Sequence, residues 1–245
     1  MNPRITLATA ARVLRQLRTD RRTIALLIIV PSLLMVLLRY VFDGSPATFN
    51  RIGLPLLGVF PFVTMFLVTS VAMLRERTSG TLERLLTTPM AKLDLLLGYA
   101  IAFTVAALVQ VAVATTIAFT WLSLDVPGGL PLVVVMAVAN ALLGMSIGLL
   151  VSAFAATEFQ AVQFLPAVVL PQFLLCGLLT PRDSMLDLLR WISDVLPLSY
   201  AVDGLRRLSM ESDFSPALGT DLAVIGGCMV VALTLGAATL RRRTS

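Results

Sequence analysis

Side chains that could do acid-base, metal or phosphate chemistry are scarce in this chain of 245 residues. It has no histidine, so imidazole bases, histidine-ligated metals and Ser-His-Asp triads are excluded. A phosphate-binding loop needs the pattern GxxxxGK[ST], but the one lysine, Lys92, follows Met90 and Ala91. The two cysteines, Cys176 and Cys228, lie in apolar runs and form no CxxC pair. We therefore expect no catalytic residue, no metal site, no bound cofactor and no ATP hydrolysis by this chain.

The overall composition is that of a membrane protein. Hydrophobic residues make up 58% of the chain and charged residues 13%, with a mean hydropathy of +0.92. Soluble domains carry about 25% charged residues, so this chain has about half the charge needed to cover a surface in water. Six spans of about 20 residues would use roughly half the length and leave no room for an ordinary soluble domain. Any soluble machinery is expected on a partner.

Uncharged runs predict where the membrane is crossed. Each run must be helical, because in lipid every backbone amide has to be satisfied within its own segment. The expected fold is an all-α polytopic membrane protein with one transmembrane domain over 23–245 that contains six transmembrane helices. The spans are expected at about 23–42, 52–74, 95–122, 131–155, 160–180 and 221–240.

Basic residues predict the orientation of these spans. An N-terminus on the inside places 13 of the 19 basic residues in the cytoplasm, including the C-terminal triplet Arg241 to Arg243, as the positive-inside rule favours. Both termini are therefore expected in the cytoplasm. Residues 1–22 place apolar and basic side chains on separate sectors at helical spacing, which predicts an amphipathic helix on the inner membrane surface. That helix is either a simple anchor or a docking surface for a partner.

The connection between the second and third spans is charged and contains helix-breaking residues. Gly80 can end the helix leaving the membrane, and a short helix from Leu82 to Thr88 can end at Pro89. From the residues alone, this is either a short helix held under the membrane or a solvated loop.

The same segment resembles the signature of type-2 ABC exporter permeases, the family that includes daunorubicin-resistance and nodulation-type permeases. The residues that carry the resemblance are Glu76, Gly80, Thr81, Leu82, Glu83, Leu85, Thr88 and Pro89. The resemblance implies that they couple the permease to an ATP-binding subunit by seating a helix in its groove. It also implies a complex of two permeases, identical or similar, with two ATP-binding subunits that hold ATP and magnesium.

A second match lies near the expected outer face. The resemblance implies short external helices that dip back into the outer leaflet before the last span and close the export path. The gate residues that it implies are Pro171, Gly177, Pro181, Trp191, Pro197, Tyr200, Asp203 and Arg206. The chain departs from the family pattern at Cys176, where a serine is common, and at Met185-Leu186, which lacks a common proline. From spacing alone, Arg190 can pair with Asp187 and Asp194 in an amphipathic helix.

Polar residues within the spans are candidate contacts for a transported molecule. Four amides lie at membrane depth and could line a substrate path, or could hydrogen-bond neighbouring helices. They are Gln110, Asn140, Gln163 and Gln172. Arg39 can snorkel and pair with Asp43 one turn on. Glu158 could guard a substrate entrance, but a solvated loop acid is the favoured reading.

The function expected is ATP-driven export of a hydrophobic or amphipathic molecule, drug or lipid-like, by alternating access across a bacterial plasma membrane. Export of a glycan or lipid-linked saccharide is the alternative, because similar permeases carry these too. An ion-gradient carrier or a membrane-embedded enzyme would need ionisable residues clustered at mid-membrane, and the spans show none. Partners expected are membrane lipids and a small hydrophobic substrate, with no nucleic acid.

Overall fold

The protein is all-helical in the part that the structure describes. A computed structural model describes residues 3–79, 92–124, 126, 129–210 and 214–239, and no strand occurs among them. The shorter elements are α1 (Pro3–Thr19), α7 (Glu158–Phe164), η2 (Leu165–Val169), α8 (Leu170–Leu175), η3 (Arg182–Ser184), α9 (Asp187–Val195) and α10 (Pro197–Leu208).

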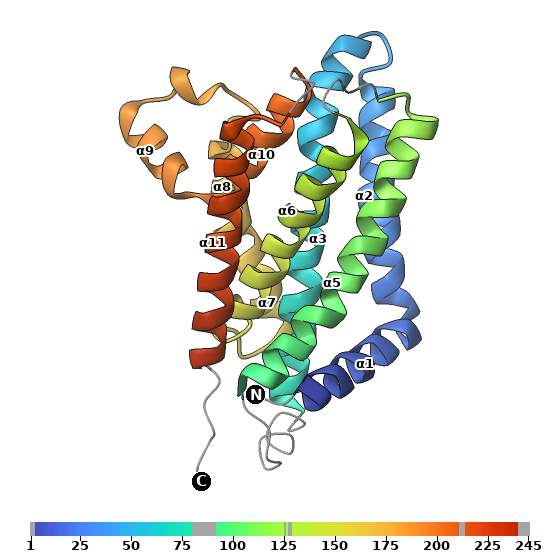
Figure 1. The fold of residues 1–245 in the computed structure, drawn as a ribbon, viewed down its shortest axis with the longest axis vertical. Helices are drawn as coiled ribbons and strands as arrows, with labels where there is room; N and C mark the ends of the chain where they lie inside the picture. Colours follow the sequence, from blue (N-terminus) through green and yellow to red (C-terminus); the bar gives the residue numbers. More distant parts are fainter. Residues whose placement is uncertain (1–2, 80–91, 125, 127–128, 211–213, 240–245) are drawn as a thin grey trace.

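Within the described residues, six helices are long and apolar enough to cross a membrane, which confirms the predicted fold class. Four are α2 (Arg21–Val41), α3 (Pro46–Thr78), α6 (Leu130–Val151) and α11 (Pro216–Thr239). The other two spans are made of several elements. The third span in chain order combines α5 (Lys92–Thr116) with the π-helical turn η1 (Ile117–Trp121), and the fifth span combines α7, η2 and α8. The six helices form one bundle, with the start of α1 and the end of α11 at the same end (Figure 1).

Helices α3 and α6 form the centre of the bundle because glycines let them approach closely. A Cβ atom at Gly144 would lie 2.2 Å from the carbonyl oxygen of Phe62, and one at Gly148 would lie 2.4 Å from that of Phe66. The spacing Gly-x-x-x-Gly places both glycines on one face of α6, a common arrangement where membrane helices touch. The Thr69 hydroxyl donates a hydrogen bond of 3.2 Å to the carbonyl oxygen of Met145 across this contact.

Helix α1 lies across one end of the bundle and packs on the beginning of α5 (Figure 1). Its apolar side chains Ala10 and Val13 are buried, whereas Leu7 is 60% exposed. A Cβ at Gly98 of α5 would lie 2.7 Å from the Thr9 side chain, so Gly98 provides the seat for α1. Whether this helix lies on a membrane surface stays a prediction.

At the opposite end, the chain makes a compact excursion between α8 and α11 (Figure 1). Gly177 follows α8 with φ of +88°, a left-handed conformation that favours glycine. The helices η3, α9 and α10 then return the chain to α11, and α10 packs against α3, α6 and α11. Only α10 of these three short helices is largely buried in the bundle.

Candidate functional site

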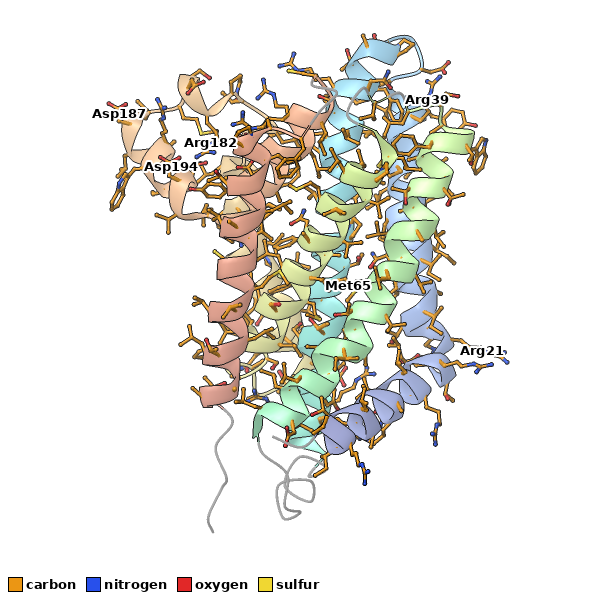
Figure 2. The ribbon with its side chains drawn as sticks, viewed as in Figure 1. Arg21, Arg39, Met65, Arg182, Asp187 and Asp194 are labelled. Carbon is orange, nitrogen blue, oxygen red and sulfur yellow. The ribbon has the colours of Figure 1, made fainter. Side chains whose placement is uncertain are left out.

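The charged side chains of the described residues gather at the two ends of the bundle. Figure 2 shows Arg21 at the end where α1 lies, and Arg39, Arg182 and Asp194 at the opposite end, with Met65 about midway between them. Each end holds a set of ion pairs that joins different helices, and at the end where α1 lies these helices are far apart in the sequence. We call the first set the α1-end network; it contains Arg12, Asp20, Arg75, Glu76, Tyr99 and Glu158. We call the second set the α9-end cluster; it contains Arg182, Asp194, Tyr200 and Asp203.

In the α1-end network, Arg12 ties α1 to α3 and α5. Its Nη1 atom donates a 2.9 Å hydrogen bond to Oε1 of Glu76, and its Nη2 atom donates one of 3.1 Å to the Tyr99 hydroxyl. The guanidinium carbon also lies 5.9 Å from the centre of the Tyr99 ring. Burial alone would lower the pKa of Arg12, but the charge interactions with Tyr99 and Glu76 outweigh it and the pKa is raised. Arg12 is thus a fixed cation that holds α1 in place.

Arg75, the residue before Glu76, joins the same network from the other side of α3. Its Nε and Nη2 atoms donate to Glu158 at 2.8 and 3.1 Å, and its Nη1 atom lies 3.9 Å from Asp20. Asp20 caps α2 by accepting hydrogen bonds from the Thr23 side chain and from the backbone amides of Arg22 and Thr23. These hydrogen bonds, led by that from the Thr23 side chain, lower the pKa of Asp20.

Glu158 is solvated, as expected, with its side chain 54% exposed. It is not an unpaired acid in a loop. It lies in the first turn of α7, and its carboxylate accepts two hydrogen bonds from the Arg75 guanidinium. Such a bidentate pair is stronger than a single-point contact and fixes the orientation of both groups. Its partner lies 83 residues earlier, on α3, which spacing along the chain could not indicate.

Of the predicted coupling residues, only Glu76 lies in the described part of the chain. It is 8% exposed in the last turns of α3, which ends at Thr78 with Ser79 as its cap. The other predicted coupling residues lie outside the described residues: Gly80, Thr81, Leu82, Glu83, Leu85, Thr88 and Pro89. Two members of the α1-end network, Arg75 and Glu76, thus lie in the last turns of α3, just before Gly80 in the sequence.

In the α9-end cluster, Arg182 is the hub. Its Nη1 atom donates a 2.5 Å hydrogen bond to Asp203 of α10, and its Nη2 atom pairs with Asp194 of α9. The guanidinium carbon lies 5.8 Å from the Tyr200 ring, whose hydroxyl donates 2.7 Å to the Asp194 carbonyl oxygen. Burial alone would lower the pKa of Arg182, but the hydrogen bond and charge of Asp203, with Asp194, raise it. The cluster locks η3, α9 and α10 together.

The expected pairing inside α9 was wrong. Arg190 pairs with Asp183 at 3.4 Å, outside α9, and Asp194 pairs with Arg182. The reason is that η3 folds back over α9 and brings Asp183 and Arg182 closer than the neighbours one turn away. By contrast, the predicted pair of Arg39 with Asp43 is present at 3.1 Å.

The predicted gate residues differ in their surroundings. Tyr200 and Asp203 belong to the α9-end cluster, and the Cγ of Arg182 lies 3.2 Å from where a Gly177 Cβ would be. Arg206 has no ion-pair partner among the described residues, whereas its neighbour Arg207 lies 3.5 Å from Asp221. The remaining four lie at the beginnings of helices or on the surface. Pro181 directly precedes η3, and Pro197 is the first residue of α10. Pro171 of α8 is exposed, and Trp191 of α9 is 70% exposed.

No hydrogen bond joins the four candidate substrate-path amides to one another within the described residues. Gln110 donates 2.5 Å to the Thr64 hydroxyl of α3, and Gln172 donates 3.1 Å to Val168 of its own chain segment. Asn140 is fully buried between Gly58 and α10, with no hydrogen bond to its amide within the described residues. Gln163 is exposed. Their role in a substrate path stays a prediction.

The cysteines are free. Cys176 is fully buried after α8, and Cys228 is half-buried in α11. Burial raises the pKa of the Cys176 thiol to about 11, so the thiol stays protonated and is a poor nucleophile near neutral pH.

Sequence reasoning missed the residues that organise both ends. Arg12, Tyr99 and Arg75 at one end and Arg182 and Asp194 at the other were not singled out as site residues. The sequence contained one indication of the two arginines. Arg12 lies in the predicted amphipathic helix of residues 1–22, and Arg182 directly follows the predicted gate residue Pro181. Their partners could not be found by spacing because they lie 12 to 87 residues away.

Comparison with known proteins gives a family and several distant relatives. The family model described as "ABC-2 type transporter" matches residues 4–209. The chain is 29% identical over 144 residues to ABC transporter G family member 20 of Dictyostelium discoideum, covering 59% of this chain and 20% of that protein. The chain is also similar to two proteins of Escherichia coli K12, the probable multidrug ABC transporter permeases YbhR and YbhS. It is 28% identical to YbhR over 57% of this chain and 39% of that protein, and 26% identical to YbhS over 69% and 45%. The chain thus spans less than half the length of each.

Proposed function

The chain belongs to the ABC-2 type transporter family, and from that premise we propose that it is the membrane permease of an ATP-driven exporter. The cargo proposed is a hydrophobic or amphipathic molecule, drug-like or lipid-like, taken from the cytoplasm or inner leaflet and released outside. The E. coli relatives named as multidrug permeases support this class of cargo. A glycan or lipid-linked saccharide is the alternative cargo.

The observation that carries the proposal is that the family match extends across both ends of the bundle, from α1 through α10. It includes the predicted coupling segment and the α1-end network. The network connects the end of α3 to three other helices through Arg12, Arg75 and Glu158. A force applied to the segment after α3 would therefore be transmitted to α1, α5 and α7.

The proposed complex contains two permeases, two copies of this chain or one with a similar permease, and two ATP-binding subunits carrying ATP and magnesium. The complex lies in a bacterial plasma membrane with the α1 end, and both termini, in the cytoplasm. ATP-driven closure of the ATP-binding subunits pushes on residues 81–88, and alternating access follows. The external helices, held by the α9-end cluster, close the path on the outside.

The test is transport in inverted membrane vesicles that contain the permease with its ATP-binding subunit. We expect uptake of a lipophilic fluorescent compound that requires hydrolysable ATP and is insensitive to collapse of ion gradients. Gly80→Pro or Glu83→Arg should abolish ATP-dependent uptake while the complex still assembles, and Asp187→Arg at the opposite end is the matched charge-reversal control. Unchanged uptake in both coupling variants would refute the role of this segment. Gradient-driven uptake without ATP would refute the function.

A further inference from the structure

A pocket opens beside the α1-end network, between α1, α2, α3, α5 and α7. Its volume is about 440 Å³, which lies within the range of about 300–1,000 Å³ common for sites that bind drug-sized molecules. Most of its wall is apolar and includes Leu17, Leu67, Val71, Ala72 and Phe103. None of the four candidate substrate-path amides lines it. The pocket is suited to the hydrophobic body of a small amphiphile.

The polar residues that line the pocket include a glutamate whose carboxylate is only partly hydrogen-bonded. Glu76 lines the pocket and is 8% exposed. Its Oε1 atom accepts the hydrogen bond from Arg12, but its Oε2 atom is buried and accepts none within the described residues. A buried carboxylate oxygen without a donor is unfavourable, and a positive charge held nearby would compensate it.

The network around the pocket also carries an excess of negative charge. Two guanidinium groups, Arg12 and Arg75, pair with three carboxylates, those of Glu76, Asp20 and Glu158. Within these ion pairs the carboxylates outnumber the guanidinium groups by one, and Arg77, next to Glu76, is a further half-buried cation outside them. Asp20, Glu76 and Arg75 all line the pocket, so the excess carboxylate charge of these pairs lies next to the apolar wall. A low-dielectric wall strengthens the attraction of such a charge for a cation.

We propose that this pocket binds a lipophilic monovalent cation of drug size, which enters from the inner leaflet with its charge toward Glu76 and its apolar body against α3 and α5. The assignment rests on the proposed function, because it names the class of cargo that the exporter collects at its cytoplasmic end. The assignment adds two things to the proposed function: a preference for positively charged cargo, and a location for the binding site.

The test measures binding to the purified permease in lipid nanodiscs, without the ATP-binding subunit, using two ions of matched size and opposite charge. Tetraphenylphosphonium should bind saturably above the background of empty nanodiscs, and tetraphenylborate should neither bind saturably nor compete. Glu76→Gln should weaken tetraphenylphosphonium binding about tenfold, since it removes a charge in contact with the cation. Asp187→Asn removes a charge at the opposite end and should leave the affinity unchanged.

A second variant keeps the test sharp if Glu76→Gln unfolds. Ala72→Phe fills the pocket without changing any charge and should abolish binding, whereas Ala112→Phe adds the same bulk at an exposed position of α5 and should not. Equal binding of the two ions, or full affinity in Ala72→Phe, would overturn the proposal. Because no ATP is present, these results stand apart from the vesicle test: absent ATP-dependent uptake refutes the proposed function, and charge-blind binding refutes the pocket assignment.

Discussion

Breaking the contact between Arg12 and Glu76 should loosen α1 from the bundle, and a double-mutant cycle measures how strongly the two residues are coupled. The variants are Arg12→Met, Glu76→Gln and the combination of both. Arg12→Met leaves the Glu76 carboxylate buried without its cation, and Glu76→Gln leaves the cation without its anion. The double variant removes both charges, so its cost should be smaller than the sum of the two single costs.

The magnitude follows from the geometry. The joined atoms are 2.9 Å apart, with the Arg12 side chain 30% exposed and the Glu76 side chain 10% exposed. Unit charges about 4 Å apart attract by about 4 kcal/mol at the effective dielectric constant of a protein surface region. Desolvation of Glu76 and solvent screening at Arg12 remove part of this. We therefore expect a coupling energy of about 2 kcal/mol, near the upper part of the range found for residues in contact.

The measurement is the free energy of unfolding in mixed detergent micelles, followed by circular dichroism for all four proteins. Arg15→Met is the matched control, because Arg15 is an exposed arginine one turn further along α1 with no ion-pair partner among the described residues. It should change stability by less than about 0.5 kcal/mol, as most surface substitutions do. A coupling energy below about 0.5 kcal/mol would refute the view that Arg12 fastens α1 to the end of α3.

Three further outcomes test other parts of the structure. Gly144→Leu should prevent accumulation of folded protein, because its Cβ would already lie 2.2 Å from a backbone oxygen of α3, while Gly226→Leu, with nothing within 4 Å, should express normally in a membrane-fraction assay. Asp20→Ala should cost about 1 kcal/mol at pH 7 through the lost cap of α2. Because the folded-state pKa of Asp20 is lowered, this cost is full above its ordinary pKa and should shrink as pH falls through the lowered folded pKa, which urea titrations at several pH values would detect. In a Trp121→Phe background, lipids brominated near the headgroup should quench Trp191, which is 70% exposed on α9, if that helix dips into the outer leaflet; quenching only by an aqueous agent would refute this.

The six-span fold was predictable because its cause is local. A run of about 20 residues without charge can only be a helix in lipid, and this holds whatever its neighbours are. The pair of Arg39 with Asp43 was predictable for the same reason, since residues four apart on a helix are neighbours. Composition and helical period contain this information directly.

The ion pairs at both ends were not predictable, because their cause is the packing of distant segments. Arg75 and Glu158 meet only because α3 and α7 pack side by side. The pairs within α9 were predicted by the same four-residue rule that held for Arg39, and failed because η3 supplied closer partners to Arg190 and Asp194. Helical spacing therefore does not predict ion pairs correctly where the chain folds back on itself within a few residues.

The sequence left open whether α1 is an anchor or a docking surface, and the contacts of Arg75 and Glu76 bear on this question. Consecutive residues of a helix point about 100° apart, so these two side chains leave the end of α3 in different directions. Glu76 is bound to Arg12 of α1, and Arg75 is bound to Glu158 of α7 and lies near the cap of α2. The end of α3 is therefore tied to α1 on one side and to α7 on another. In the proposed exporter, a push on the segment after α3 would displace α1 and α7 with it, which makes α1 a moving part of the coupling apparatus.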